Sequence, residues 1–138
     1  MNEHLSLTQL LYSCWIVSGT NNNEREVVPT KSVLAYALQD LVDRGMFPEW
    51  ARRELHFVSA DTGLICVELA SIESLATELK IISYPYFSYS KNHILVGKPW
   101  ALRYLSELEI SEEKAKVWGN TLRQAVVVAR VQMRFALV

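Results

Sequence analysis

Residues 54–69 read ELHFVSADTGLICVEL, and this stretch decides the fold class. The triplet Asp61-Thr62-Gly63 is typical of a hairpin turn in which Gly63 takes a left-handed bulge position. With that turn His56 faces Glu68, and one face of the hairpin carries the large apolar side chains. The residues on that face are Leu55, Phe57, Ile65, Val67 and Leu69. The alternation predicts an antiparallel hairpin over residues 55–60 and 64–69 that packs on a core.

Apolar residues at helical spacing surround the hairpin and predict amphipathic helices on both sides of it. The second helix is the best defined, because Thr30 is a suitable N-cap and Gly45 a suitable C-terminal stop. Its expected core positions are Leu34, Ala37, Leu38, Leu41 and Val42. Other helices are expected to begin at about Ser6, Pro48, Ser71 or Ser74, Pro99 and Ser111.

Two segments are less determinate than the helices. Residues 93–97 are short and apolar and predict a brief strand that could extend the hairpin to three strands. Residues 125–137 fit either a helix or an alternating strand, and the helix is slightly favoured. Either structure is too apolar to lie free in water, so we expect the C-terminus to be buried in the domain or against a partner.

Length and composition indicate one α+β domain over residues 1–138, with amphipathic helices on one face of a small antiparallel sheet. Half of the 138 residues are hydrophobic, and four prolines and five glycines exclude a low-complexity chain. Met1 is not followed by a basic segment, and no apolar run approaches the length of a membrane span. The sequence therefore predicts a cytoplasmic protein with no membrane association.

The formal net charge of −1 conceals an asymmetry between the two ends of the chain. Residues 1–50 carry three basic and six acidic side chains, whereas residues 111–138 carry five basic and two acidic ones. The two ends could attract each other within a subunit or between subunits, although ordinary surface scatter is the favoured explanation. The two cysteines form no C-x-x-C pair and the three histidines are dispersed, so neither a disulfide, a metal site nor a cofactor is expected.

The best acid/base pair in the sequence is His56 with Glu68, because a carboxylate beside an imidazole raises its basicity. No serine or cysteine nucleophile is tied to this pair by a motif, so a polar pair between the strands is the favoured interpretation. A small enzyme that uses His56 and Glu68 remains an alternative. Asp61-Thr62-Gly63 also matches the triplet of pepsin-like proteases, but it suits a hairpin turn better.

One segment, YPYFSYSKNH at residues 84–93, is unusually aromatic. Aromatic side chains provide a large contact area at low entropic cost, as in interface anchors and ligand pockets. A loop that packs its rings on the core is an equally good explanation. The candidate ligand- or partner-binding residues are Tyr84, Tyr86, Phe87, Tyr89, Lys91 and His93.

Residues 30–69 have the general outline of a winged-helix DNA-binding unit, with a helix at 30–44 and a wing tip at 60–63. The helix, however, would expose Gln39, Asp40 and Asp43, and the wing tip carries Asp61. Phosphate contacts need positive charge at those places, so nucleic acid is not favoured.

The leading hypothesis is a non-enzymatic binding or regulatory protein that associates with itself, as a dimer, through the aromatic segment or the apolar C-terminus. Its four tryptophans support this hypothesis, because aromatic residues are enriched in interface cores. The sequence does not identify a further protein or small-molecule partner.

Overall fold

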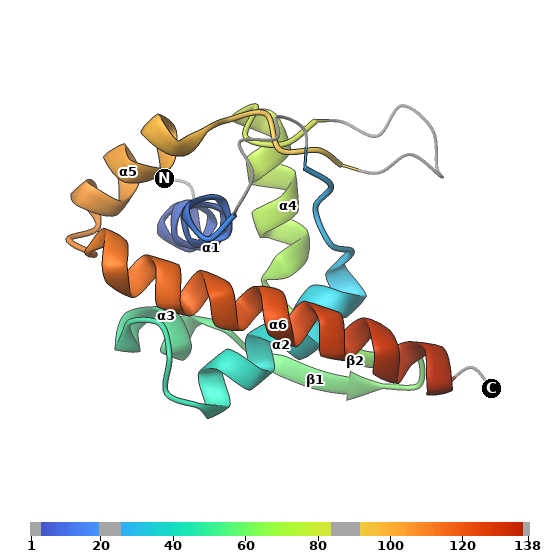
Figure 1. Cartoon of the computed structure of the whole chain (residues 1–138). Helices are drawn as coiled ribbons and strands as arrows, with labels where there is room; N and C mark the ends of the chain where they lie inside the picture. Colours follow the sequence, from blue (N-terminus) through green and yellow to red (C-terminus); the bar gives the residue numbers. More distant parts are fainter. Residues whose placement is uncertain (1–3, 20–25, 84–91, 137–138) are drawn as a thin grey trace.

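Helix α1 (Leu5–Val17) lies at the centre of the molecule, with α4 (Leu69–Glu78), α5 (Lys98–Glu107) and α6 (Glu112–Ala136) around it (Figure 1). This computed structural model describes residues 4–19, 26–83 and 92–136. Within those ranges the chain forms six helices and one two-stranded antiparallel sheet, which confirms the predicted α+β class. Nine of the thirteen residues of α1 are buried, so α1 is covered on nearly all sides rather than along one stripe.

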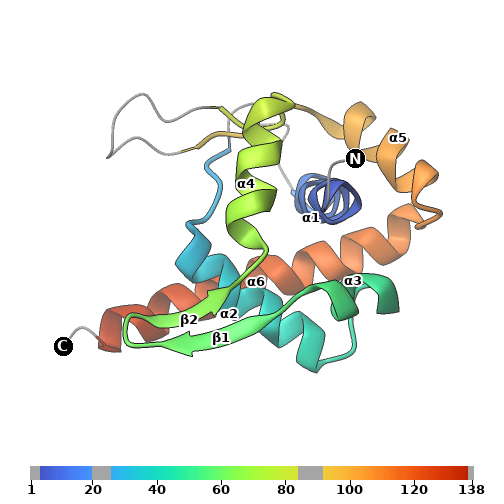
Figure 2. The same ribbon diagram turned by 180° about the vertical axis from the view of Figure 1, so that it is seen from behind.

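Helix α2 (Lys31–Asp43) confirms the predicted second helix almost to the residue. Thr30 occupies the N-cap position with an extended backbone, and Gly45 follows the helix with a φ of 71°. That positive φ explains the glycine, since a side chain is strained in the left-handed region. Helix α2 packs between α6 and strand β2 (Gly63–Cys66), as Figure 2 shows from behind.

The short helix α3 (Glu49–Glu54) follows Pro48 as predicted and leads into the hairpin of β1 (Phe57–Ala60) and β2 (Gly63–Cys66). The predicted register of this hairpin is wrong by one residue. Asp61 and Thr62 alone form the loop, so Ala60 pairs with Gly63 and Val58 pairs with Ile65. A two-residue loop shifts every pair relative to a three-residue loop.

The observed register places other side chains on the packed face of the hairpin than the predicted register did. Phe57, Leu64 and Cys66 are partly or fully buried, whereas Ile65 and Val67 are about half exposed, contrary to the prediction. The cause lies in residues 64–67, which are all apolar and therefore give no alternation that fixes the face. Both strands are also shorter than predicted, since Leu69 belongs to the next helix.

Helix α4 (Leu69–Glu78) begins directly after the hairpin, before the predicted caps Ser71 and Ser74. The predicted strand at 93–97 is absent from the described residues, where His93 and Ile94 form only isolated bridges with Val27 and Ile82. The hairpin therefore has no third strand within the described part of the chain. Helix α5 (Lys98–Glu107) begins next to Pro99 as predicted.

Helix α6 (Glu112–Ala136) is 25 residues long and settles the ambiguity of the C-terminus in favour of a helix. The Ser111 hydroxyl accepts a hydrogen bond from the Lys114 backbone N–H at 3.2 Å, which confirms Ser111 as the N-cap. The core face of α6 carries Ala115, Gly119, Leu122, Val126 and Ala129, all buried. At Gly119 this face meets the backbone of α1 so closely that a side chain has no room.

Candidate functional site

A groove of about 340 Å³ runs between α2 and α6. Helix α2 contributes Tyr36, Gln39, Asp40, Asp43 and Arg44. Helix α6 contributes Thr121, Gln124, Ala125, Val128, Ala129 and Gln132. Asp40 and Arg44 also form an ion pair at 3.2 Å along one wall. The lining offers hydroxyls, amides and charged groups for binding, but neither a histidine nor a cysteine for proton transfer or nucleophilic attack.

The outward side of α6 carries an apolar surface next to this groove. Four valines there are between 48% and 59% exposed, although Val126 and Ala129 on the same helix are almost completely buried. We call them the α6 valines: Val117, Val127, Val128 and Val131. Helix α6 lies on the outside of the molecule, at the front in Figure 1 and at the back in Figure 2. Only the inner side of α6 is buried in the domain, so the predicted burial of the C-terminus holds for that side alone.

The structure brings His56 and Glu68 together, although not as the facing pair of strand residues that the sequence predicted. Glu68 is the N-cap of α4, and its side chain reaches back to His56 from there. Its Oε1 accepts the His56 backbone N–H at 2.7 Å, and its Oε2 lies 2.9 Å from His56 Nδ1. Glu68 is therefore a structural link between the hairpin and α4.

The environment of this pair favours a structural role. The hydrogen bond and negative charge of Glu68 raise the pKa of His56 above its usual value near 6.5. The Glu68 carboxylate is 7% exposed, whereas the His56 imidazole is 67% exposed and does not border the α2–α6 groove. A second, smaller cavity lies between α1 and the start of α2, beside Trp15 and Val28, and His56 does not border it either. The neighbouring Cys66 is buried, which raises the pKa of its thiol to about 11 and leaves it protonated at neutral pH.

The predicted aromatic site lies largely outside the described residues. Tyr84, Tyr86, Phe87, Tyr89 and Lys91 all fall between positions 84 and 91. His93 lies within the described residues and is half buried. Its backbone forms a β-bridge with Val27 and hydrogen bonds with Ser83. Its backbone thus holds the segments on either side of residues 84–91 together.

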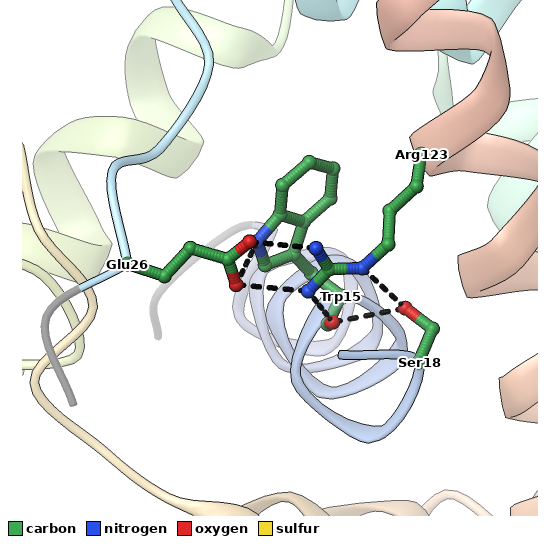
Figure 3. Close-up of polar contacts among 4 residues, drawn as sticks. All are labelled: Trp15, Ser18, Glu26 and Arg123. Carbon is green, nitrogen blue, oxygen red and sulfur yellow. Dashed lines mark hydrogen bonds and ion pairs between the residues drawn. The ribbon is translucent and has the colours of Figure 1, made fainter. Parts of the chain in front are cut away.

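The sequence did not reveal a polar cluster that joins α1, α6 and the segment before α2 (Figure 3). Arg123 donates from both terminal nitrogens to the Glu26 carboxylate, at 2.6 and 2.9 Å. It also donates to the Ser18 hydroxyl at 2.8 Å and to the Trp15 carbonyl oxygen at 2.5 Å. Its guanidinium lies 4.1 Å from the centre of the Trp15 ring, whose indole N–H donates to Glu26. The charge asymmetry between the chain ends was the only sequence signal for this cluster.

The Arg123 cluster is a structural feature rather than a binding site. A bidentate carboxylate, a hydroxyl and a carbonyl already use four of the five N–H donors of the guanidinium, and the indole covers its face. The cluster fixes the C-terminal end of α1 against the middle of α6. It thereby holds rigid the helix that carries the α6 valines.

The winged-helix hypothesis gains no support from the surface charges. Helix α2 places Asp40 and Asp43 along the groove, and the exposed loop of the hairpin carries Asp61. These carboxylates would oppose a phosphate backbone at both expected contact points.

Two further features concern the whole described part of the chain. No group of three or more His, Cys, Asp or Glu side chains in residues 4–19, 26–83 and 92–136 is arranged to hold a metal ion. In the same ranges, none of the helices has both the length and the apolar character needed to cross a membrane.

Comparisons with protein-family models, with curated proteins and with solved structures find no match to this chain. The function is therefore inferred from its own surface.

Proposed function

We propose that this chain is a non-enzymatic binding or regulatory protein that works as a homodimer, with the outward face of α6 as the contact surface. The exposure of the four α6 valines is the observation that carries the proposal. A solvated helix normally presents polar side chains on its outer side, and larger apolar patches mark interaction sites.

Burial of the α6 valines would offset the free energy that two molecules lose when they associate. Full burial of a valine side chain contributes about 1.5 to 3 kcal/mol, so a half-exposed valine contributes about 1 kcal/mol on further burial. Eight such valines in a dimer contribute roughly 8 kcal/mol, which is comparable to the free energy lost when two molecules associate. A dissociation constant on the order of micromolar corresponds to a net free energy of about 8 kcal/mol, which the contacts of neighbouring side chains must supply.

The test is the molar mass in solution, measured by sedimentation equilibrium over a concentration range that spans the micromolar region. The native chain should change from monomer to dimer across this range. The double variant Val128→Glu/Val131→Glu should weaken the dimer by about 100-fold or more, because association would then bury two unpaired carboxylates in each subunit.

A matched control is available on the hairpin. Val58 and Ile65 form an exposed pair on its outer face, with exposures of 51% and 45% that are close to those of Val128 and Val131. The variant Val58→Glu/Ile65→Glu makes the same chemical change away from α6 and should dimerise like the native chain. A native chain that stays monomeric at hundreds of micromolar would contradict the proposal.

A further inference from the structure

The two walls of the α2–α6 groove differ in charge. Asp40, Asp43 and Arg44 are the charged residues of the lining and all lie on α2, whereas α6 contributes only neutral side chains. Two carboxylates against one guanidinium give the lining a formal charge of −1. Arg44 is paired with Asp40, and none of the ion pairs in the part of the chain that the structure describes involves Asp43. The groove therefore contains an uncompensated carboxylate.

The position of Asp43 strengthens the preference of this end of the groove for a positive charge. Asp43 is the last residue of α2, and the C-terminal end of a helix carries the negative end of the helix dipole. The carboxylate and the dipole thus attract a cation and repel an anion. Asp43 is exposed, so a ligand can reach its carboxylate from solvent without any change in the fold.

The remainder of the groove offers contacts to a carbon skeleton. Tyr36 lies seven residues before Asp43 on the same face of α2, so its ring is two turns away along the same wall. Its hydroxyl accepts a hydrogen bond from the Leu64 backbone N–H at 3.4 Å, which links the ring to the hairpin. On the α6 wall, Ala125 and Ala129 are one turn apart, and their short side chains leave room between the two helices. An aromatic ring and two methyl groups suit the apolar part of a ligand.

The groove has the size of a site for a small molecule. Its volume of about 340 Å³ is close to the lower end of the range from about 300 to 1,000 Å³ that is typical of ligand pockets. The wall from Tyr36 to Asp43 covers seven residue steps, or about 10 Å at 1.5 Å per residue. Gln124 and Gln132 add amide groups that can donate to or accept from polar substituents. The lining therefore fits a small ligand with one cationic end and one apolar end.

We propose that the α2–α6 groove binds a small organic amine. Its ammonium group would donate hydrogen bonds to the Asp43 carboxylate, and its carbon skeleton would pack in the part of the groove lined by Tyr36, Ala125 and Ala129. The site is formed by one chain, so this inference goes beyond the proposed self-association and does not depend on it.

An NMR titration of the native chain with 2-phenylethylamine tests the class of ligand. This probe carries an ammonium group and an aromatic ring, and it should bind with a dissociation constant of about 1 mM or lower. The matched probe 3-phenylpropionate carries the same ring but a carboxylate in place of the ammonium group. It should bind at least about tenfold more weakly, because the uncompensated carboxylate repels it. Equal binding of the two probes would overturn the inference.

A variant of Asp43 tests the residue that holds the ammonium group. Asp43→Asn removes the charge and keeps the size of the side chain, and it should weaken the binding of 2-phenylethylamine about tenfold or more. The control Asp61→Asn makes the same change in the hairpin loop, outside the groove, and should bind like the native chain. Both positions are exposed, so both variants should retain the native circular dichroism spectrum. Native binding by Asp43→Asn would refute the assigned contact.

The same titration shows where the amine binds. The side-chain amide signals of Gln124 and Gln132 should shift as the amine is added, whereas the signal of Asn92, which is not part of the groove, should stay in place. The absence of any shift at about 10 mM amine, ten times the expected dissociation constant, would overturn the inference.

The outcome of these titrations is separate from the oligomeric state. Asp43→Asn leaves the α6 valines unchanged, so it should dimerise like the native chain in the sedimentation experiment. A chain that binds the amine but stays monomeric would support this inference and contradict the proposed function. A dimer that does not bind the amine would overturn this inference and leave the proposed function standing.

Discussion

The close approach of α6 to α1 at Gly119 makes Gly119→Ala an informative substitution. In the middle of a helix, alanine is normally more favourable than glycine by about 1 kcal/mol. Here the added methyl carbon would lie 2.5 Å from Ser18 Oγ and even closer to the Cys14 carbonyl oxygen. The carbonyl belongs to the backbone of α1 and cannot rotate away, so we expect Gly119→Ala to destabilise the fold.

The size of this destabilisation follows from how far α1 and α6 must separate to make room for the methyl group. Ordinary van der Waals contact begins at 3.4 Å, so α1 and α6 must move apart by about 1 Å. Overpacking of this kind costs about 1 to 3 kcal/mol. The same movement lengthens the bonds from Arg123 to Ser18 and Trp15, and bonds to a charged group contribute about 1.5 to 3 kcal/mol each. After subtraction of the helix preference, we expect a net loss of roughly 3 kcal/mol.

Thermal unfolding followed by circular dichroism measures this loss. For a chain of this size, 3 kcal/mol corresponds to a decrease in Tm of about 10 °C. The adjacent variant Asn120→Ala changes an exposed residue of the same helix and should be at least as stable as the native chain. A Gly119→Ala protein that unfolds at or above the native Tm would refute the close packing of α1 on α6.

Three other variants or measurements test separate features. Glu68→Gln should lower the pKa of His56 in an NMR titration. In the native chain, the stabilisation from this pair should be complete below pH 6.5 and fade as the pH rises through the raised pKa of His56, and an unchanged titration would contradict the contact. Arg123→Ala should lower the free energy of unfolding in urea by about 2 to 3 kcal/mol and alter the near-ultraviolet circular dichroism signal of Trp15. A variant with unchanged stability and an unchanged spectrum would contradict the cluster. A thiol reagent should leave Cys14 unmodified until the protein unfolds, and rapid labelling in native buffer would show that α1 is not buried.

The helices could be predicted from the sequence where their ends carry distinct signals. Thr30 and Gly45 bound α2, and Ser111 marks the start of α6. The hairpin register could not be predicted, because a two-residue and a three-residue loop both suit Asp61-Thr62-Gly63. The start of α4 was missed for a related reason, since residues 64–69 satisfy the preferences of a strand as well as those of a helix.

Among the polar contacts, one between residues close in sequence could be predicted, whereas one between distant residues could not. The contact between His56 and Glu68 was anticipated because both residues flank one hairpin, although the predicted register was wrong. The bond between Arg123 and Glu26 joins positions 97 residues apart, and no spacing rule connects them. The outward exposure of Val127 and Val128 was equally inaccessible, because a valine-rich run does not show which of its members face the core.

The central position of α1 has a consequence for the order in which the protein folds. This helix is synthesised before its packing partners α4, α5 and α6, and α6 begins about 95 residues after α1 ends. A nascent chain that has not reached Arg123 cannot close the contact that fixes the end of α1. The core around α1 therefore forms only after α6 has been synthesised, and until then the apolar sides of α1 are open to chaperones or to aggregation.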